Sequence, residues 1–244
     1  MIRQPDYRYP GGRILVFAKA PVPGEVKTRL AAHIGKQAAA VLYEQLLRDT
    51  VGLALGSGLA PVELHVASQS RHPLFVSLAD RQAVEVRLQK GSDLGQRMCN
   101  AITSTLRTAD FALLIGTDCP AMSADYLQRA CRQLDAGSAV VLGPAEDGGY
   151  ILIGARTCDE RLFTDIPWSS DRVLQLTRAR LQALKLPYTE LHTLWDLDRL
   201  EDLQRWQRES RAVMTGTCRS AVPRRESRPG GRSYMKIICN DWVE

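Results

Sequence analysis

Short apolar runs that alternate with longer segments of helical periodicity constrain the fold of this 244-residue chain more than any other feature. Residues 14–18 and 111–116 are continuous apolar runs, which are typical of strands buried on both faces of a parallel sheet. Residues 35–55 instead carry apolar side chains at helical spacing. The alternation continues to about residue 213, so it predicts an α/β domain whose mostly parallel sheet is covered by helices on both faces.

The other predicted elements follow the same spacing. Further strands are expected at residues 62–67, 84–88, 140–143, 150–154 and 188–191, and further helices at residues 94–106, 123–134, 172–184 and 200–213. We therefore expect three regions: an N-terminal extension (1–12), one domain (13–214) and a basic, flexible C-terminal tail (215–244).

The distribution of charge argues against a nucleic-acid-binding surface. Residues 219–236 hold six basic residues and one acidic residue, so this segment accounts for the whole formal net charge of +5. The sequence has no apolar run long enough to span a membrane and no apolar stretch typical of a signal peptide near its start. Its six cysteines form no C-x-x-C pair. We expect a cytoplasmic protein with reduced thiols.

The segment after the first strand is the most informative loop. In open α/β sheets ligands bind at the carboxyl ends of the strands, and Lys19, Lys27 and Arg29 all follow such an end. Lysine and arginine bind diphosphate in complementary ways, and Gly24 allows the backbone to approach a ligand closely. These residues are candidates for nucleotide or phosphate binding. A solvated surface loop is the alternative interpretation.

Five motifs in this order resemble one bacterial family, the glycosyltransferases of the arsenosugar-biosynthesis type. They read F-A-K-A-P-x-P-G-x-V-K-T-R-L, G-x-D-L-G-x-R-M, I-G-T-D-C-P, D-G-G-Y and W-S-S, and the similarity spans residues 13–206. The resemblance implies the GT-A fold of nucleotide-diphospho-sugar transferases, with a nucleotide-activated sugar and a small-molecule acceptor as partners. It also implies that Asp118 fills the place of the metal-binding acid for Mg²⁺ or Mn²⁺, although the usual Asp-x-Asp motif is incomplete here.

A second metal ligand is expected from the sequence W-D-L-D. Asp196 and Asp198 alternate on an extended segment and so point the same way, and the family resemblance slightly favours Asp198. The alternative is that Asp198 only caps the helix that begins near residue 200.

Three further groups are candidate site residues. Asp147 is our candidate general base, and Gly148 and Gly149 let the backbone turn beside an acceptor, although a plain hairpin turn explains the same letters. Asp93 and Arg97 resemble a nucleotide-contacting stretch of related nucleotidyltransferases, with a helix-capping role as the alternative for Asp93. Trp168 and Ser169 are candidates to line the acceptor pocket, with a core or lid role as the alternative for Trp168.

These features favour a metal-dependent glycosyltransferase that uses a nucleoside diphosphate sugar. A nucleotidyltransferase that joins a nucleoside triphosphate to a phosphorylated small molecule remains an alternative, because basic loops and metal-binding acids suit that reaction too. A non-catalytic nucleotide-binding module is the third possibility, since fold alone does not determine function.

Overall fold

The computed structural model describes residues 6–68, 71–82 and 84–214. The strands in this part of the chain form one seven-stranded sheet in the order β3-β2-β1-β4-β6-β5-β7. Strand β6 runs antiparallel to both of its neighbours, and the other strand pairs are parallel. The strands are β1 (Gly12–Ala18), β2 (Val62–Val66), β3 (Glu85–Leu88), β4 (Phe111–Ile115), β5 (Val140–Pro144), β6 (Tyr150–Ala155) and β7 (Tyr188–Glu190).

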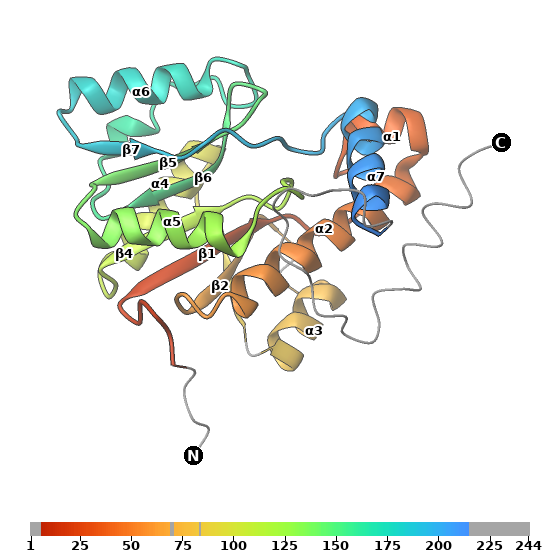
Figure 1. Cartoon of the computed structure of the whole chain (residues 1–244), viewed down its shortest axis with the longest axis horizontal. Helices are drawn as coiled ribbons and strands as arrows, with labels where there is room; N and C mark the ends of the chain where they lie inside the picture. Colours follow the sequence, from red (N-terminus) through yellow and green to blue (C-terminus); the bar gives the residue numbers. More distant parts are fainter. Residues whose placement is uncertain (1–5, 69–70, 83, 215–244) are drawn as a thin grey trace.

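Helices cover both faces of the sheet, as predicted. The helical segments are α1 (Thr28–Ile34), α2 (Lys36–Gly56), α3 (Pro73–Gln82), α4 (Leu94–Thr105), α5 (Ala124–Asp135), the 3-10 turn η1 (Glu160–Leu162), α6 (Val173–Ala183) and α7 (Leu200–Met214). Side chains of β1 alternate between two cores: Ile14 and Val16 pack with α2, α3 and α5, whereas Leu15 and Phe17 pack with α4 and α6. Figure 1 shows these helices on opposite sides of the strands.

A third apolar cluster joins the helices at one end of the molecule. Leu30 of α1 and Leu42 of α2 pack there against Trp195 and Leu197, together with Leu203 of α7. In Figure 1, α1 and α7 lie side by side, and the chain reaches α7 from β7 by a long extended segment. This cluster fixes that segment, which crosses the end of the sheet where the site residues lie.

Helices α1 and α3 were not predicted. Helix α1 has only seven residues, too few to show a helical repeat within a segment that we interpreted as a loop. Helix α3 begins with Pro73 in its first turn, which is a usable helix-start signal, and buries Leu74, Phe75 and Leu78.

The boundaries of the predicted regions differ in part from the structure. Gly12, which we predicted to lie in the N-terminal extension, belongs to β1, and Tyr9 N donates a backbone hydrogen bond to Leu59 O. The tail at 215–244 lies outside the described residues.

None of the described helices combines the length and the apolar character that crossing a membrane requires.

A polar network interrupts the otherwise apolar β2. Glu63 is buried, and its Oε2 lies 3.0 Å from both the Nε2 of His65 and the Nε of Arg87 on β3. Burial alone raises the pKa of Glu63, but the hydrogen bond from His65 and the charge of Arg87 outweigh it, so the pKa lies below its ordinary value. The ionised carboxylate therefore stabilises the fold.

Glu63→Gln is expected to lower the free energy of unfolding by about 1 to 3 kcal/mol at pH 7, because it removes a buried, charge-assisted pair. Since the folded-state pKa is lowered, this contribution is present above the unfolded-state pKa and is lost as the pH falls through the folded-state value. Urea unfolding of both proteins at pH 7 and pH 3 measures it. A difference between the two proteins that stays constant with pH would contradict the assignment.

Candidate functional site

Four segments meet at the carboxyl edge of the sheet. They are the loop after β1, the segment 116–120 after β4, the hairpin 145–149 between β5 and β6, and the segment 191–199 that leads from β7 to α7. The last of these joins the others through backbone hydrogen bonds: Glu146 N donates to Leu194 O over 3.0 Å, and Leu197 N donates to Asp118 O over 2.7 Å. Residues that are far apart in the sequence therefore come together here.

The ion pair between Lys27 and Asp118 lies at the centre of this edge. Lys27 Nζ is 2.8 Å from Asp118 Oδ1 and also donates a hydrogen bond to the carbonyl oxygen of Leu197. The Lys27 side chain is only 2% exposed, whereas that of Asp118 is 48% exposed. Lys27 itself adopts a left-handed backbone conformation, with φ 47° and ψ 43°, which is uncommon for a residue with a side chain. The lysine is thus a fixed internal cation that orients Asp118.

Tyr43 of α2 ties two of these segments together, and the sequence did not single it out. Its hydroxyl accepts a hydrogen bond of 2.9 Å from Lys19 N and one of 3.3 Å from the Thr117 hydroxyl. Burial, and next the charge of Asp118, raise the pKa of Tyr43 to about 12, so the hydroxyl stays protonated. The aromatic ring of Tyr43 packs in the apolar stripe of α2 like any core side chain, so the helical periodicity did not separate it from purely structural residues.

Asp196 is a partly buried carboxylate with like charges nearby. Its pKa is raised to about 6, first by burial and next by the charges of Asp147 and Asp118, while Lys27 acts in the opposite direction. Asp147 and Asp118 therefore lie close enough to Asp196 for their charges to act on it. An added positive charge there would relieve the repulsion.

Asp198, the other acid of this segment, has a different environment. Its Oδ2 lies 2.8 Å from Arg29 Nη1, and both side chains are partly exposed. At the start of α7 the backbone N–H groups of Asp198 and Arg199 donate to Asp202 Oδ2, so Asp202 makes a capping contact there. The role of Asp198 as a metal ligand stays a prediction. The structure brings Arg29 and Asp198 together as a pair beside the Lys27–Asp118 pair.

The hairpin that carries Asp147 has a precisely fixed backbone. Ala145 N donates to Gly149 O, and Gly149 N donates to Asp147 Oδ1 over 2.8 Å. Gly148 has φ +87°, and a Cβ placed there would lie 2.1 Å from Asp171 O. Its own carbonyl accepts from Leu174 N at the start of α6. The turn is therefore packed against the approach to α6, and Asp147 stands exposed at its tip.

The remaining predicted residues divide between two places. Lys19 is exposed directly after β1, and Gly24 turns the same loop with φ +88°. Asp93 caps α4 by accepting from Gln96 N, and Arg97 donates to the Gly91 carbonyl, so both belong to the first turn of that helix.

Trp168 packs on the first turn of α4 as well. A Cβ on Gly95 would lie 2.6 Å from the indole ring, and the ring also stacks on Phe163. Ser169, the next residue, is exposed and has φ 71°. The tryptophan is thus held between α4 and the segment that follows η1.

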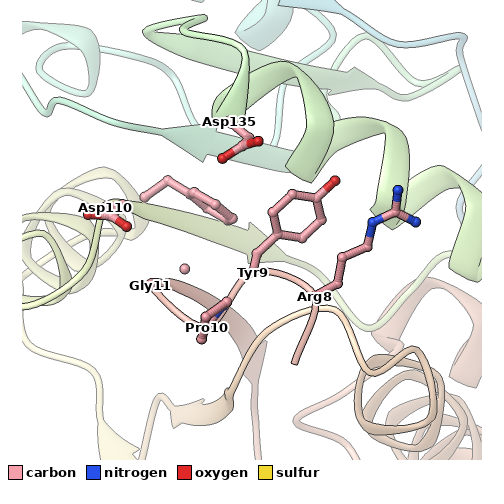
Figure 2. A pocket seen from close by; sticks show the side chains of 8 residues that line it. Arg8, Tyr9, Pro10, Gly11, Asp110 and Asp135 are labelled. Carbon is pink, nitrogen blue, oxygen red and sulfur yellow. The ribbon is translucent and has the colours of Figure 1, made fainter. Parts of the chain in front are cut away.

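A cavity of about 350 Å³ lies at the opposite edge of the sheet, where β1 and β4 begin. Figure 2 shows Arg8, Tyr9, Asp110 and Asp135 among the side chains that line it. The ring of Tyr9 packs edge-on against Phe111, which closes the cavity toward the core. Because ligands of open α/β sheets bind at the carboxyl ends of strands, this cavity is not our candidate site.

Gly148→Ala is expected to destabilise the protein by about 2 kcal/mol or more beyond Gly137→Ala. Both glycines have positive φ, but a Cβ at Gly137 meets open space, whereas one at Gly148 meets the Asp171 carbonyl. The pair of variants thus separates steric overlap from backbone strain, which costs about 1 kcal/mol in each. Chemical denaturation measures both, and equal losses would show that the turn relaxes freely away from Asp171.

Comparison with known proteins supports this description of the fold. The sequence pattern of a family described as "Uncharacterized protein conserved in bacteria (DUF2064)" matches residues 50–170. A protein of Desulfovibrio desulfuricans G20, provisionally named a nucleotide-diphospho-sugar transferase, has 27% sequence identity and a TM-score of 0.74, over 85% of this chain and 98% of that one. Among proteins with curated descriptions, none matches this chain.

More distant structures share the fold alone. A cytidylyltransferase of Leptospira borgpetersenii serovar Hardjo-bovis has 17% identity and a TM-score of 0.53, over 82% of this chain and 86% of that one. A nucleotidyl transferase of Methanothermobacter thermautotrophicus has 18% identity and a TM-score of 0.52, over 83% of this chain and 98% of that one. The chain therefore carries the DUF2064 pattern over residues 50–170 and has the α/β, GT-A-like fold of the nucleotide-diphospho-sugar transferases.

Proposed function

We propose that this protein transfers a sugar from a nucleoside diphosphate sugar to a small-molecule acceptor with the help of Mg²⁺ or Mn²⁺. The observation that carries the proposal is the group of acids at the carboxyl edge, in which Asp118 pairs with the internal cation Lys27 and the charges of Asp147 and Asp118 act on the partly buried Asp196. The similarity to the Desulfovibrio protein, 27% identical over nearly its whole length, supports the same class of reaction. Membership of the arsenosugar-biosynthesis type is the finer prediction within that class.

The acids suit a divalent cation that is shared with a substrate. No group of three or more His, Cys, Asp or Glu side chains in the described part of the chain has the geometry of a complete metal site. Mg²⁺ in proteins is commonly held by one or two carboxylates, with phosphate oxygens and water completing the shell. Asp118 is half exposed and Asp196 carries unfavourable like-charge interactions, so these two oxygen donors fit such a site. The bound cation would neutralise charge that develops on the diphosphate leaving group.

The exposure of each cationic residue decides the role that we assign to it. Lys19 is exposed at the end of β1 and is the residue we assign to direct contact with the diphosphate, beside Gly24. Lys27 is buried, so it contributes positive potential and holds Asp118 in place. Arg29 is 57% exposed, and its guanidinium has further N–H donors for a second phosphate contact while it stays paired with Asp198. Asp93 and Arg97, at the first turn of α4, are assigned to the nucleoside part of the donor.

The acceptor is assigned to the hairpin side of the edge. Asp147 is exposed at the tip of a rigid turn, where it is free to take a proton from an acceptor hydroxyl. Gly148 and Gly149 form the turn that presents Asp147 to the acceptor, and the Asp171 carbonyl fills the space beside Gly148. Trp168 offers an aromatic surface for a sugar or an apolar group, and Ser169 a hydroxyl next to it.

Nucleotidyl transfer is the second candidate. The observation that favours it is the shared fold with a cytidylyltransferase and a nucleotidyl transfer enzyme, each with a TM-score above 0.5. Under this reading the same acids and cations bind a nucleoside triphosphate, and the reaction releases pyrophosphate. Consumption of a triphosphate with formation of pyrophosphate distinguishes it from sugar transfer.

A thermal-shift screen tests the donor and the cation together. We expect the melting temperature to rise with a nucleoside diphosphate sugar plus Mn²⁺, because a ligand that binds only the native state stabilises it by mass action. The rise should be lost in Asp118→Asn, in which the side chain keeps its shape but loses the charge that pairs with Lys27. Asp125→Asn is the matched control, since Asp125 is an exposed acid of α5 paired with Arg129. Stabilisation by triphosphates alone would favour nucleotidyl transfer.

Separate substitutions of the two candidate second ligands test which acid holds the cation. We expect Asp196→Asn to raise the Mn²⁺ concentration needed for half-maximal stabilisation by at least about tenfold. Asp198→Asn should leave that concentration nearly unchanged, because Asp198 is engaged by Arg29. A titration of Mn²⁺ at fixed donor concentration measures both variants. The reverse order would restore Asp198 as the metal ligand that the family resemblance favours.

A further inference from the structure

Two thiols that are far apart in the sequence face each other beneath α4. The sulfur of Cys99, within α4, lies 3.6 Å from the sulfur of Cys158, in the segment between β6 and η1. The Cys158 thiol also lies 3.8 Å from the Cys99 carbonyl oxygen. Neither residue belongs to the proposed sugar-transfer site. The contact joins two parts of the chain that pack on the same face of the sheet.

The pair differs in its exposure from the other two cysteines in the part of the chain that the structure describes. Cys119 and Cys131 are buried, whereas Cys99 and Cys158 are each partly exposed. A small reagent from solution therefore reaches these two residues more readily than Cys119 or Cys131. A disulfide has an S–S distance of about 2.05 Å, so the two sulfurs need to approach by roughly 1.5 Å. Cys158 lies in an irregular segment that is able to supply such a movement, while Cys99 is held by its helix.

We propose that Cys99 and Cys158 form a dithiol site that is converted to an intramolecular disulfide by exchange with a small-molecule disulfide. In the first step the Cys99 thiolate attacks one sulfur of the reagent, which forms a mixed disulfide and releases one thiolate. In the second step Cys158 gives up its proton to solvent and attacks the Cys99 sulfur. The Cys99–Cys158 bond forms, the second thiolate leaves, and the reagent has gained the two electrons that the pair has lost.

The order of the two attacks follows from the surroundings of Cys158. Burial, and next the neighbouring Cys99, raise the pKa of the Cys158 thiol to about 12, and Asp159 acts in the same direction. The Cys158 thiolate is therefore scarce at neutral pH, which disfavours a first attack on a dilute reagent, whereas its 3.6 Å distance from the Cys99 sulfur favours the intramolecular second attack. The negative charge of Asp159 also repels anionic reagents from the pair, so we expect an uncharged disulfide to react faster than an anionic one.

The disulfide would fasten α4 to the chain that leaves β6. The same helix begins with the turn that contains Asp93 and Gly95, and Gly95 is in contact with Trp168. The bond would thus immobilise one side of the sheet around that tryptophan. It would also close a loop of nearly sixty residues in the unfolded chain, since the two cysteines are 59 positions apart. Both effects raise the melting temperature.

The test uses the full chain and the uncharged reagent bis(2-hydroxyethyl) disulfide. After blocking of free thiols and digestion with trypsin, we expect peptide 98–107 to be linked to peptide 157–161 in most molecules. The melting temperature should rise by roughly 5 °C and return on reduction. Mixed disulfides at Cys99 or Cys158 without the linked peptide would overturn the proposal, as would linkage of either residue to another cysteine.

Two variants separate the roles of the two thiols. In Cys158→Ser, Cys99 should accumulate as a stable mixed disulfide with the reagent, because the resolving thiol is absent. In Cys99→Ser, Cys158 should remain a free thiol over the same period. Modification of Cys158 in that variant at the wild-type rate would overturn the assigned order. The linked peptide in the wild-type protein decides the existence of the site even if either variant folds poorly.

Discussion

The buried ammonium group of Lys27 is the interaction on which the carboxyl edge depends. It bonds to Asp118 at the end of β4 and to the carbonyl oxygen of Leu197 in the segment from β7 to α7. A charged group that is almost without solvent contact lowers the stability of the fold unless it is paired and hydrogen-bonded. Movement of either segment away from Lys27 would therefore be unfavourable. The left-handed backbone at Lys27 is maintained by the same contacts.

The cores on the two faces of the sheet place this edge. Helix α2 packs on one face and reaches the edge with Tyr43, whose hydroxyl holds the ends of β1 and β4 at a fixed separation. The cluster around Trp195 and Leu197 then presses the long segment against α1 and α2. Acids that repel one another are thereby kept close, which an isolated loop could not achieve. The repulsion that Asp196 experiences from these acids lowers the stability of the fold, which is typical of residues that are retained for binding.

Much of the fold could be predicted from the sequence because its signals are local. Buried strands appear as apolar runs and α2 as a clear helical repeat, and both were predicted nearly to their ends. Helices α1 and α3 were missed because seven or ten residues hold too little periodicity, although Pro73 marks the start of α3. The place of β6 in the sheet, antiparallel between β4 and β5, depends on pairing between distant residues and has no local signature.

The site was predictable in its composition and less so in its contacts. Asp118 and the basic residues Lys19, Lys27 and Arg29 could be predicted because they directly follow strands in the sequence. The burial of Lys27 and the pairing of Arg29 with Asp198 depend instead on how distant segments pack. Tyr43 gave no signal, because its spacing fits the apolar stripe of α2. The contacts of Asp202 with the backbone at the start of α7 likewise require the actual path of the chain.

The reversed direction of β6 divides the edge into two parts of different construction. Segments on the β1 and β4 side are reached through crossover helices, so a change of length there displaces a whole helix. The tip that carries Asp147 is instead the turn of a hairpin, which is joined to the sheet by its own two strands and to the start of α6 through Gly148. A change of length in this turn therefore acts first on the approach to α6 and leaves the helices that follow β1 and β4 in place.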